Sequence, residues 1–109
     1  MKVHLTIEEA KAQLDKATDP FVLLMQHGSM QVEYFSPKKE DNQTPHKQDE
    51  LYVIAAGNSL FYRGDEVINC KQGDVLFVPA GMHHHFQNFS DDFATWVIFY
   101  GKDGGEASA

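Results

Sequence analysis

The sequence predicts one all-β domain with a single short N-terminal helix. Short runs of strand-forming residues, separated by turn residues, recur from residue 21 to residue 100. Phe is the commonest aromatic residue, with eight copies, and aromatic side chains favour strands. Only the first twenty residues place apolar side chains at helical spacing. The 109 residues, of which 42% are hydrophobic, suffice for one domain with one core.

The predicted helix spans residues 7–17. Thr6 and Glu9 have the spacing of a capping box, in which two side chains satisfy free amide groups at a helix start. Apolar residues then follow at intervals of three and four. The helix should end before Asp19-Pro20, because the residue before a proline avoids helical backbone angles.

About eight strands with short turns are predicted after the helix. The turns contain glycine or clusters of small polar and charged residues. This pattern indicates an antiparallel barrel or a two-sheet jelly roll, and by itself it does not separate these from an ordinary sandwich. The predicted strands cover residues 21–27, 30–35, 44–56, 59–62, 66–70, 75–78, 82–89 and 93–100.

Charge and cysteine content argue against several classes of partner and location. The formal net charge of -7 gives no support for binding to nucleic acid or to an anionic membrane, which require basic patches. Charges interrupt the N-terminal segment every few residues, so we expect neither a signal peptide nor a membrane span. Cys70 is the only cysteine, and a single thiol is typical of a reducing cytosol. We therefore expect a cytoplasmic protein.

Two stretches of the sequence contain residues whose spacing gives information on function. In the second, residues 73–88, five anchor residues are separated by five, one, two and three positions: Gly73, Pro79, Gly81, His84 and Asn88. This stretch resembles the second cupin motif at every anchor. The first, residues 44–57, resembles the first cupin motif through His46, Glu50 and Gly57. It departs from that motif at Thr44, where the first of two histidines would fall.

The resemblance implies a small jelly-roll barrel, or double-stranded β-helix, with its site inside the barrel mouth. One cupin domain would then fill residues 1–109, with the barrel at about 21–100 and a flexible polar tail at 101–109. It also implies that His46, Glu50 and His84 are ligands of a divalent transition metal: Fe, Mn, Ni or Zn. Three protein ligands leave positions open for water, oxygen or substrate.

The departure at Thr44 leaves the metal's identity, and whether one binds, open. In a regular strand, Thr44, His46, Gln48 and Glu50 would share one face. Thr44 would then border the metal, although a threonine hydroxyl is a poor ligand, and Thr44→His would restore a fourth ligand. Gln48 is a candidate to contribute its amide oxygen.

Further residues are candidates for lining the site. Tyr34 and Tyr52 have the parity to bring a polar tip into the cavity. His83 and His85 should point away from His84 if the segment is extended. The remaining candidates are better explained by core packing, although cupin barrels line their cavities with aromatic residues: Phe86, Trp96 and Phe99. Cys70 has no activating base in the sequence and is expected to be a buried packing thiol.

The sequence supports three functions. The first is a metal-dependent enzyme that acts on a small oxygenated substrate, as a dioxygenase or isomerase does. The second is a non-catalytic module, a sensor or carrier, that holds a metal or small ligand. The third is a barrel that has lost its metal. Spacing does not choose among these, because one fold serves many activities.

A homodimer is expected from apolar residues on the face opposite to the site. Leu51, Val53 and Ala55 have this parity, and Val97 and Phe99 are expected to face away from the site as well. An exposed sheet face is normally polar, and a large apolar patch on a monomer is a liability. The N-terminal helix can cover only part of it.

Overall fold

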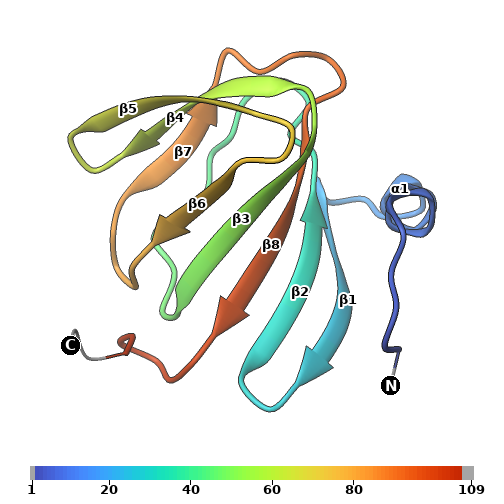
Figure 1. Ribbon diagram of the computed structural model, residues 1–109, viewed down its shortest axis with the longest axis horizontal. Coiled ribbons are helices and arrows are strands. Elements are labelled where there is room, and N and C mark those ends of the chain that lie inside the picture. Colours follow the sequence, from blue (N-terminus) through green and yellow to red (C-terminus); the bar gives the residue numbers. More distant parts are fainter. Residues whose placement is uncertain (1, 107–109) are drawn as a thin grey trace.

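The computed structural model describes residues 2–106 and contains one helix and eight strands in that range (Figure 1). The helix ends two residues before the predicted boundary, and the predicted strand 44–56 begins only at residue 49; the other strands lie within two residues of their predicted bounds. The elements are α1 (Ile7–Asp15), β1 (Phe21–His27), β2 (Met30–Phe35), β3 (Asp49–Ala56), β4 (Asn58–Arg63), β5 (Glu66–Lys71), β6 (Val75–Val78), β7 (His84–Gln87) and β8 (Ala94–Tyr100). No helix within the described range is both long enough and apolar enough to cross a membrane.

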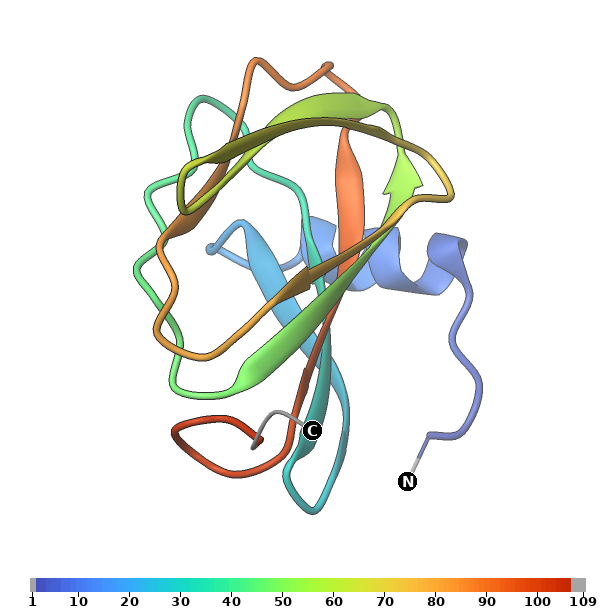
Figure 2. The same cartoon turned by 60° about the vertical axis from the view of Figure 1, so that its left-hand side comes forward.

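The strands form two antiparallel sheets that face each other (Figures 1 and 2). The larger sheet has the order β1-β2-β8-β3-β6, and the smaller has the order β5-β4-β7. This arrangement confirms the predicted all-β class and the jelly-roll barrel. Aromatic side chains from both sheets fill the space between them, with Phe86 at the centre. Its ring lies 4.7 Å from Phe61, 4.8 Å from Phe93 and 5.0 Å from Tyr52.

Helix α1 packs on the outer side of the larger sheet, beside β1 and β2 (Figures 1 and 2). Ala10 is fully buried there, and the Tyr34 ring meets Trp96 edge-on at 5.0 Å. The prediction that Tyr34 brings a polar tip into the cavity is therefore wrong. Its strand has the opposite parity to the one we assumed, so the ring lies under the helix.

The register between β3 and β8 decides which side chains enter the barrel. Glu50 pairs with Phe99 and Tyr52 pairs with Val97, and paired residues in an antiparallel sheet share a face. Val97 and Phe99 therefore point inward, and our expectation that they face away from the site is wrong. Trp96 and Ile98 occupy the outer face instead.

Gly57, the last anchor of the first motif, lies where β3 turns into β4. Its φ angle is +74°, a region that side chains disfavour. A Cβ atom here would also collide with the Ser90 and Asp92 side chains and would lie 2.9 Å from the Phe93 Cα. The loop before β8 therefore packs directly against this glycine, which explains the residue type at the anchor.

Gly57→Ala should destabilise the protein more than Gly73→Ala. Both positions have positive φ, at +74° and +93°, so each alanine stores backbone strain of about 1–3 kcal/mol. Only Gly57→Ala adds a backbone collision, because nothing lies within 4 Å of a Cβ at Gly73. Denaturant unfolding of the two variants measures the difference. Equal losses would mean that the loop moves away at no cost.

Candidate metal centre

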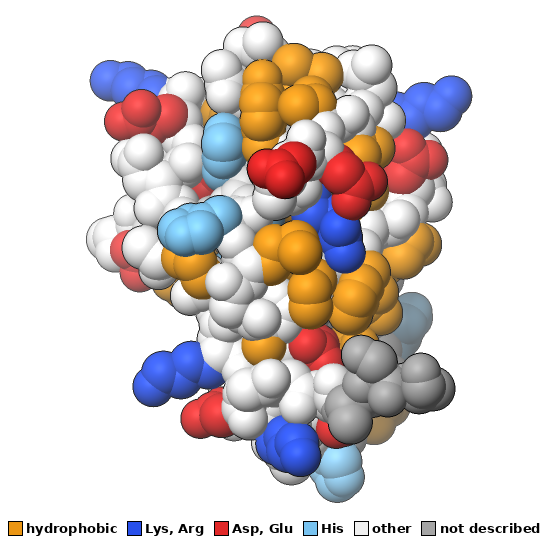
Figure 3. Space-filling view, turned by 90° about the vertical axis from the view of Figure 1, so that its left-hand side faces the viewer, with side chains coloured by type: hydrophobic (Ala, Val, Ile, Leu, Met, Phe, Trp, Pro, Cys, Tyr) orange, Lys and Arg blue, Asp and Glu red, His pale blue; other side chains and the backbone are white. Residues whose placement is uncertain are grey.

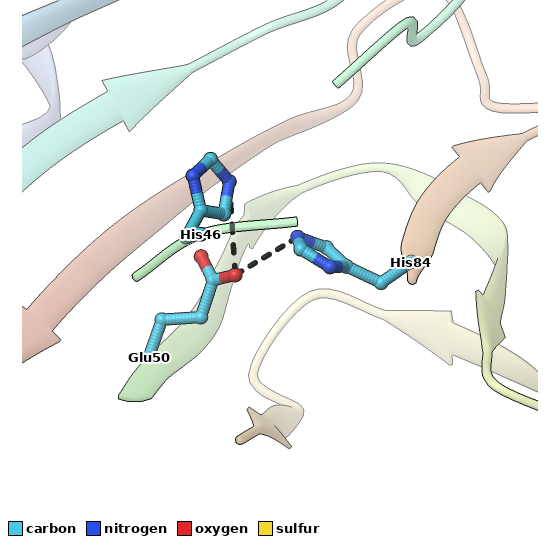
Figure 4. A group of neighbouring side chains, drawn as sticks. All are labelled: His46, Glu50 and His84. Carbon is cyan, nitrogen blue, oxygen red and sulfur yellow. Dashed lines mark ion pairs between the residues drawn. The ribbon is translucent and has the colours of Figure 1, made fainter. Parts of the chain in front are cut away.

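The side chains of His46, Glu50 and His84, from two segments of the chain, point toward one another (Figure 4). Glu50 is the second residue of β3, and its inward parity places the carboxylate between the sheets. His84 begins β7, on the opposite sheet. His46 comes from the loop that leads into β3. The structure thus brings together the three ligands that the cupin resemblance implied.

The donor atoms lie close enough to share one ion. All three lie within 4.8 Å of one another. His84 Nε2 lies 2.8 Å from Glu50 Oε1, and His46 Nε2 lies 3.8 Å from the same oxygen. Glu50 and His84 are buried, at 1% and 4% exposure, whereas His46 is partly exposed. The carboxylate and one imidazole therefore form the floor of the site, and His46 forms its rim.

The protonation pattern of His84 leaves a lone pair pointing at the carboxylate. His84 Nδ1 lies 2.9 Å from the Met82 carbonyl, which only accepts, so Nδ1 carries the proton. In the neutral ring Nε2 is then an acceptor that faces Glu50. Both Glu50 oxygens are buried without a hydrogen bond, and His84 Nε2 lies 2.8 Å from Oε1, a contact that becomes an ion pair only when His84 is protonated. Converging acceptors of this kind require a cation, so the residues fit a metal.

The two histidines respond differently to their surroundings. Burial lowers the pKa of His84, but the Glu50 carboxylate and the Met82 carbonyl outweigh burial, and the pKa is raised. For His46, burial dominates and lowers the pKa; Glu50 opposes this shift, and His84 reinforces it. In the metal-free protein, His84 is therefore the imidazole that protonates first as the pH falls.

Backbone contacts hold the loop that carries His46. The Gly81 amide, from the second motif, donates to the His46 carbonyl at 2.9 Å. The Gly104 amide donates to the Lys47 carbonyl at 2.7 Å. The buried Asp49 carboxylate accepts from the Ala80 and Glu106 amides, which lowers the pKa of Asp49. Part of the expected C-terminal tail thus supports the site; residues 107–109 lie outside the described residues.

Thr44 does not border the site, contrary to the prediction. Strand β3 begins only at Asp49, so the alternation of a regular strand does not apply to residues 44–48. Thr44 is exposed, and Gln43, one position earlier, brings its Oε1 to 3.1 Å from His46 Nε2 and 3.2 Å from His84 Nε2. Sequence reasoning missed Gln43 because it assumed strand geometry before the strand begins.

Of the other residues predicted to line the site, one reaches the donors, one lines the cleft and one lies in the core. Tyr52 donates its hydroxyl to Gln43 Oε1 at 3.1 Å, so it does reach the site. Gln48 lines the cleft beside His46, but its amide nitrogen donates to the Ser29 and Gly101 carbonyls. Phe86 is 1% exposed and belongs to the core behind Tyr52.

The three consecutive histidines point in the predicted directions, with His84 toward the site and His83 and His85 away from it. His84 points into the barrel and His83 is exposed. His85 stacks on Tyr62 of the neighbouring strand, with ring centres 4.8 Å apart and planes within 4°. Cys70 is buried as expected, and burial raises the pKa of its thiol to about 11, which makes it unreactive.

A cleft of about 320 Å³ opens beside the three donors and reaches them through Gln43, His46 and Tyr52. Its wall is largely apolar, and Phe99 meets the His46 ring edge-on at 5.0 Å, so Phe99 is a lining residue rather than core alone. Glu33 also faces the cleft, and burial together with the Glu50 charge raises its pKa. The lining residues are Phe21, Gln31, Glu33, Phe35, Gln43, His46, Lys47, Gln48, Tyr52, Val97 and Phe99.

Glu33 was missed from the sequence, where it is the one charge in the predicted strand 30–35. It could have been found from its spacing, because residues two apart in a strand share a face, and Glu33 is two residues before the apolar Phe35.

Comparison with known families matches residues 31–100 to the cupin domain. The chain belongs to the cupin family. The match includes both motifs and seven of the eight strands. Cupin barrels among solved structures share the fold. A cupin 2 conserved barrel protein from Salinispora arenicola has a TM-score of 0.68 at 15% identity, and covers 93% of this chain and 89% of its own.

Relatives among curated proteins are similar over shorter stretches. An uncharacterised protein from Streptomyces coelicolor is 39% identical over 59 residues, which are 54% of this chain and 56% of its own length. The acireductone dioxygenase of Frankia alni is 38% identical over 64 residues, which are 54% of this chain and 31% of that enzyme. The chain thus spans about a third to about half of the length of these relatives.

Glu50→Gln should lower the pKa of His84 in the metal-free cupin, because it removes the carboxylate that raises it. A histidine whose folded pKa is raised contributes stability below its unfolded pKa of about 6.5, and this contribution is lost as pH rises through the folded pKa. The stability advantage of the wild type over Glu50→Gln should therefore shrink as the pH rises above about 6.5 and through the raised folded pKa of His84. Histidine NMR titration and denaturant unfolding at several pH values measure both effects. An advantage that grows with pH would contradict the assigned pairing.

Proposed function

We propose that this cupin binds one divalent transition metal through His46, Glu50 and His84. The observation that carries the proposal is the buried Glu50 carboxylate, which has no hydrogen bond and faces the imidazole nitrogens. Imidazole and carboxylate together suit Fe, Mn, Ni or Zn. These donors suit a barrel that holds a metal better than one that does not, because without a metal the negative charge of the buried carboxylate would not be balanced.

We further propose that the loaded protein is an enzyme of the dioxygenase type, acting on a small oxygenated substrate. A bound metal of this kind supplies Lewis-acid or oxygen-activating chemistry. The similarity to acireductone dioxygenases supports this class over an isomerase. In the cleft, Val97 and Phe99 would shield the substrate from water, and Glu33 would hold or accept a proton.

The alternative is a metal carrier or sensor without catalysis. It is favoured by the burial of Glu50 and His84, which leaves His46 as the one ligand at the cleft. The limited coverage of the dioxygenase relatives also weakens transfer of their activity. The two functions differ in whether the metal keeps an exchangeable position.

His84→Ala and Glu50→Gln should each weaken Mn(II) or Ni(II) binding at least tenfold, because the first removes an imidazole donor and the second replaces the anionic carboxylate by a neutral amide. His83→Ala, an exposed neighbour, is the matched control and should bind as the wild type does. Titration of the metal-stripped protein, with elemental analysis of the protein as purified, provides the measurement. A folded wild type that binds none of the four metals would refute the proposed site.

Oxygen uptake then separates enzyme from carrier. The protein loaded with Fe(II) or Ni(II) is incubated with a synthetic acireductone and with other small enediols or hydroxyketones. Consumption that is lost in His84→Ala and kept in His83→Ala supports the enzyme. Tight metal binding with no consumption of oxygen or substrate supports the carrier.

We also propose that the cupin is a cytoplasmic homodimer, with the outer face of the larger sheet as its interface. Strand pairing places apolar residues side by side there: Leu51 pairs with both Ile98 and Phe77, and Val53 pairs with Val75. Phe77 and Val75 are 42% and 61% exposed. Figure 3, which views the molecule from the side of β4, β5 and β6, shows hydrophobic side chains among charged ones. A second copy of this face would cover them.

Phe77→Asp should convert the dimer to a monomer of 12.3 kDa, because it places a charge in the apolar interface. Val67→Asp is the matched control, since Val67 is 56% exposed on β5 of the other sheet. Light scattering at micromolar concentration gives the mass. A wild type that is already a monomer would show that this face is not a dimer interface.

A further inference from the structure

The amide oxygen of Gln43 lies at the meeting point of the three proposed ligands. It is 3.1 Å from His46 Nε2, 3.2 Å from His84 Nε2 and 3.1 Å from the Tyr52 hydroxyl. A carbonyl oxygen has two lone pairs. Tyr52 donates to one of them, which leaves the second directed at the two imidazoles.

The orientation of this amide is fixed from behind by Asp41. Gln43 Nε2 donates to Asp41 Oδ2 at 2.6 Å, and the Gln43 backbone amide donates to Asp41 Oδ1 at 3.2 Å. A carboxylate only accepts, so the amide nitrogen must face Asp41 and the oxygen must face the histidines. Asp41 Oδ2 also accepts from the Phe86 amide at 2.9 Å, which ties the loop to β7.

Gln43 therefore presents an acceptor where acceptors already crowd. In the neutral His84 ring, Nε2 carries a lone pair, and this atom faces oxygens of both Glu50 and Gln43. Without a cation among them, these groups would repel one another. The fixed amide oxygen thus points toward the same cation that Glu50 requires.

We propose that Gln43 is the fourth protein ligand of the metal, donating through Oε1, and that Asp41 is the positioning residue that holds this oxygen inward. This inference rests on the proposed metal site. The donor set becomes two imidazoles, one carboxylate and one neutral amide oxygen. Because oxygen donors suit Mn(II) and imidazoles suit Ni(II) and Zn(II), Gln43 shifts the selectivity of the site toward Mn(II).

Paired substitutions at neighbouring positions test the assignment. Affinities for Mn(II) and Ni(II) are measured on the metal-stripped full chain by chelator competition, and folding is checked by thermal melting. Gln43→Ala should weaken Mn(II) binding about tenfold or more. Gln43→His should raise the ratio of Ni(II) to Mn(II) affinity about tenfold or more. Thr44→Ala and Thr44→His, at the exposed neighbouring position, should leave both affinities within about twofold of the wild type.

Asp41→Asn tests the positioning role. Asparagine has one acceptor oxygen for the three N–H groups that Asp41 accepts, those of Gln43 Nε2, the Gln43 backbone and the Phe86 backbone, so the Gln43 amide is no longer held in one orientation. Mn(II) affinity should fall several-fold in Asp41→Asn and should not fall further in the double variant with Gln43→Ala, because both changes remove the same oxygen. Additive losses would assign Asp41 a separate, structural role.

The outcomes separate this inference from the proposed site. If the wild type binds metal and the Gln43 variants keep both affinities and their ratio, the Gln43 assignment is wrong and the three-ligand site stands. If the Thr44 variants change affinity instead, the loop has the register of a regular strand. If the folded wild type binds neither ion, the site and the Gln43 assignment both fail. Should Gln43→Ala not fold, the selectivity ratio of Gln43→His decides.

Discussion

The Glu50 carboxylate lies 1% exposed inside the barrel, and its charge must be balanced there. No hydrogen bond satisfies it, and the nearest groups are the imidazoles of His84 and His46. Protonation of His84 can supply the balancing charge in acid, and a metal ion can supply it where the imidazoles are neutral. Proton and metal thus compete for one place, which links the pH response of the empty protein to its affinity for metal.

The surrounding frame keeps these groups together although they come from two separate segments. Strand β3 provides Glu50, and the opposite sheet provides His84. The His46 loop is tied to the second motif through the Gly81 amide, and to the C-terminal segment through Gly104. Asp49, beside Glu50 in the chain, binds the same two regions, because its carboxylate accepts from the Ala80 and Glu106 amides. These hydrogen bonds join backbone amides to the His46 and Lys47 carbonyls and to the Asp49 carboxylate, so they hold the loop without using the side chains proposed to bind metal.

The cleft and the loop together determine what the site can accept. The amide oxygen of Gln43 is neutral and is a weaker base than the imidazole nitrogen of a histidine would be at the same place. The cleft beside it is largely apolar, with Phe99 against His46, and Glu33 on the neighbouring strand adds one carboxyl group. Such a cleft suits a small molecule that has an apolar part and oxygen atoms able to reach the ligands.

The fold class, most of the strand positions and three of the groups at the site could be predicted from the sequence. Turn glycines, short apolar runs and the spacing of His46, Glu50 and His84 are local features, and local features survive without tertiary context. That Gln43, and not Thr44, faces the histidines could not be predicted, because it depends on long-range contacts of the loop. The loop before β3 is irregular, and one of the hydrogen bonds that hold it joins the Asp41 carboxylate to the Phe86 amide, 45 positions away in the chain. The burial of Tyr34 under the helix and of Phe99 beside His46 likewise depends on strand pairing, because the pairing register fixes which face of each strand enters the barrel.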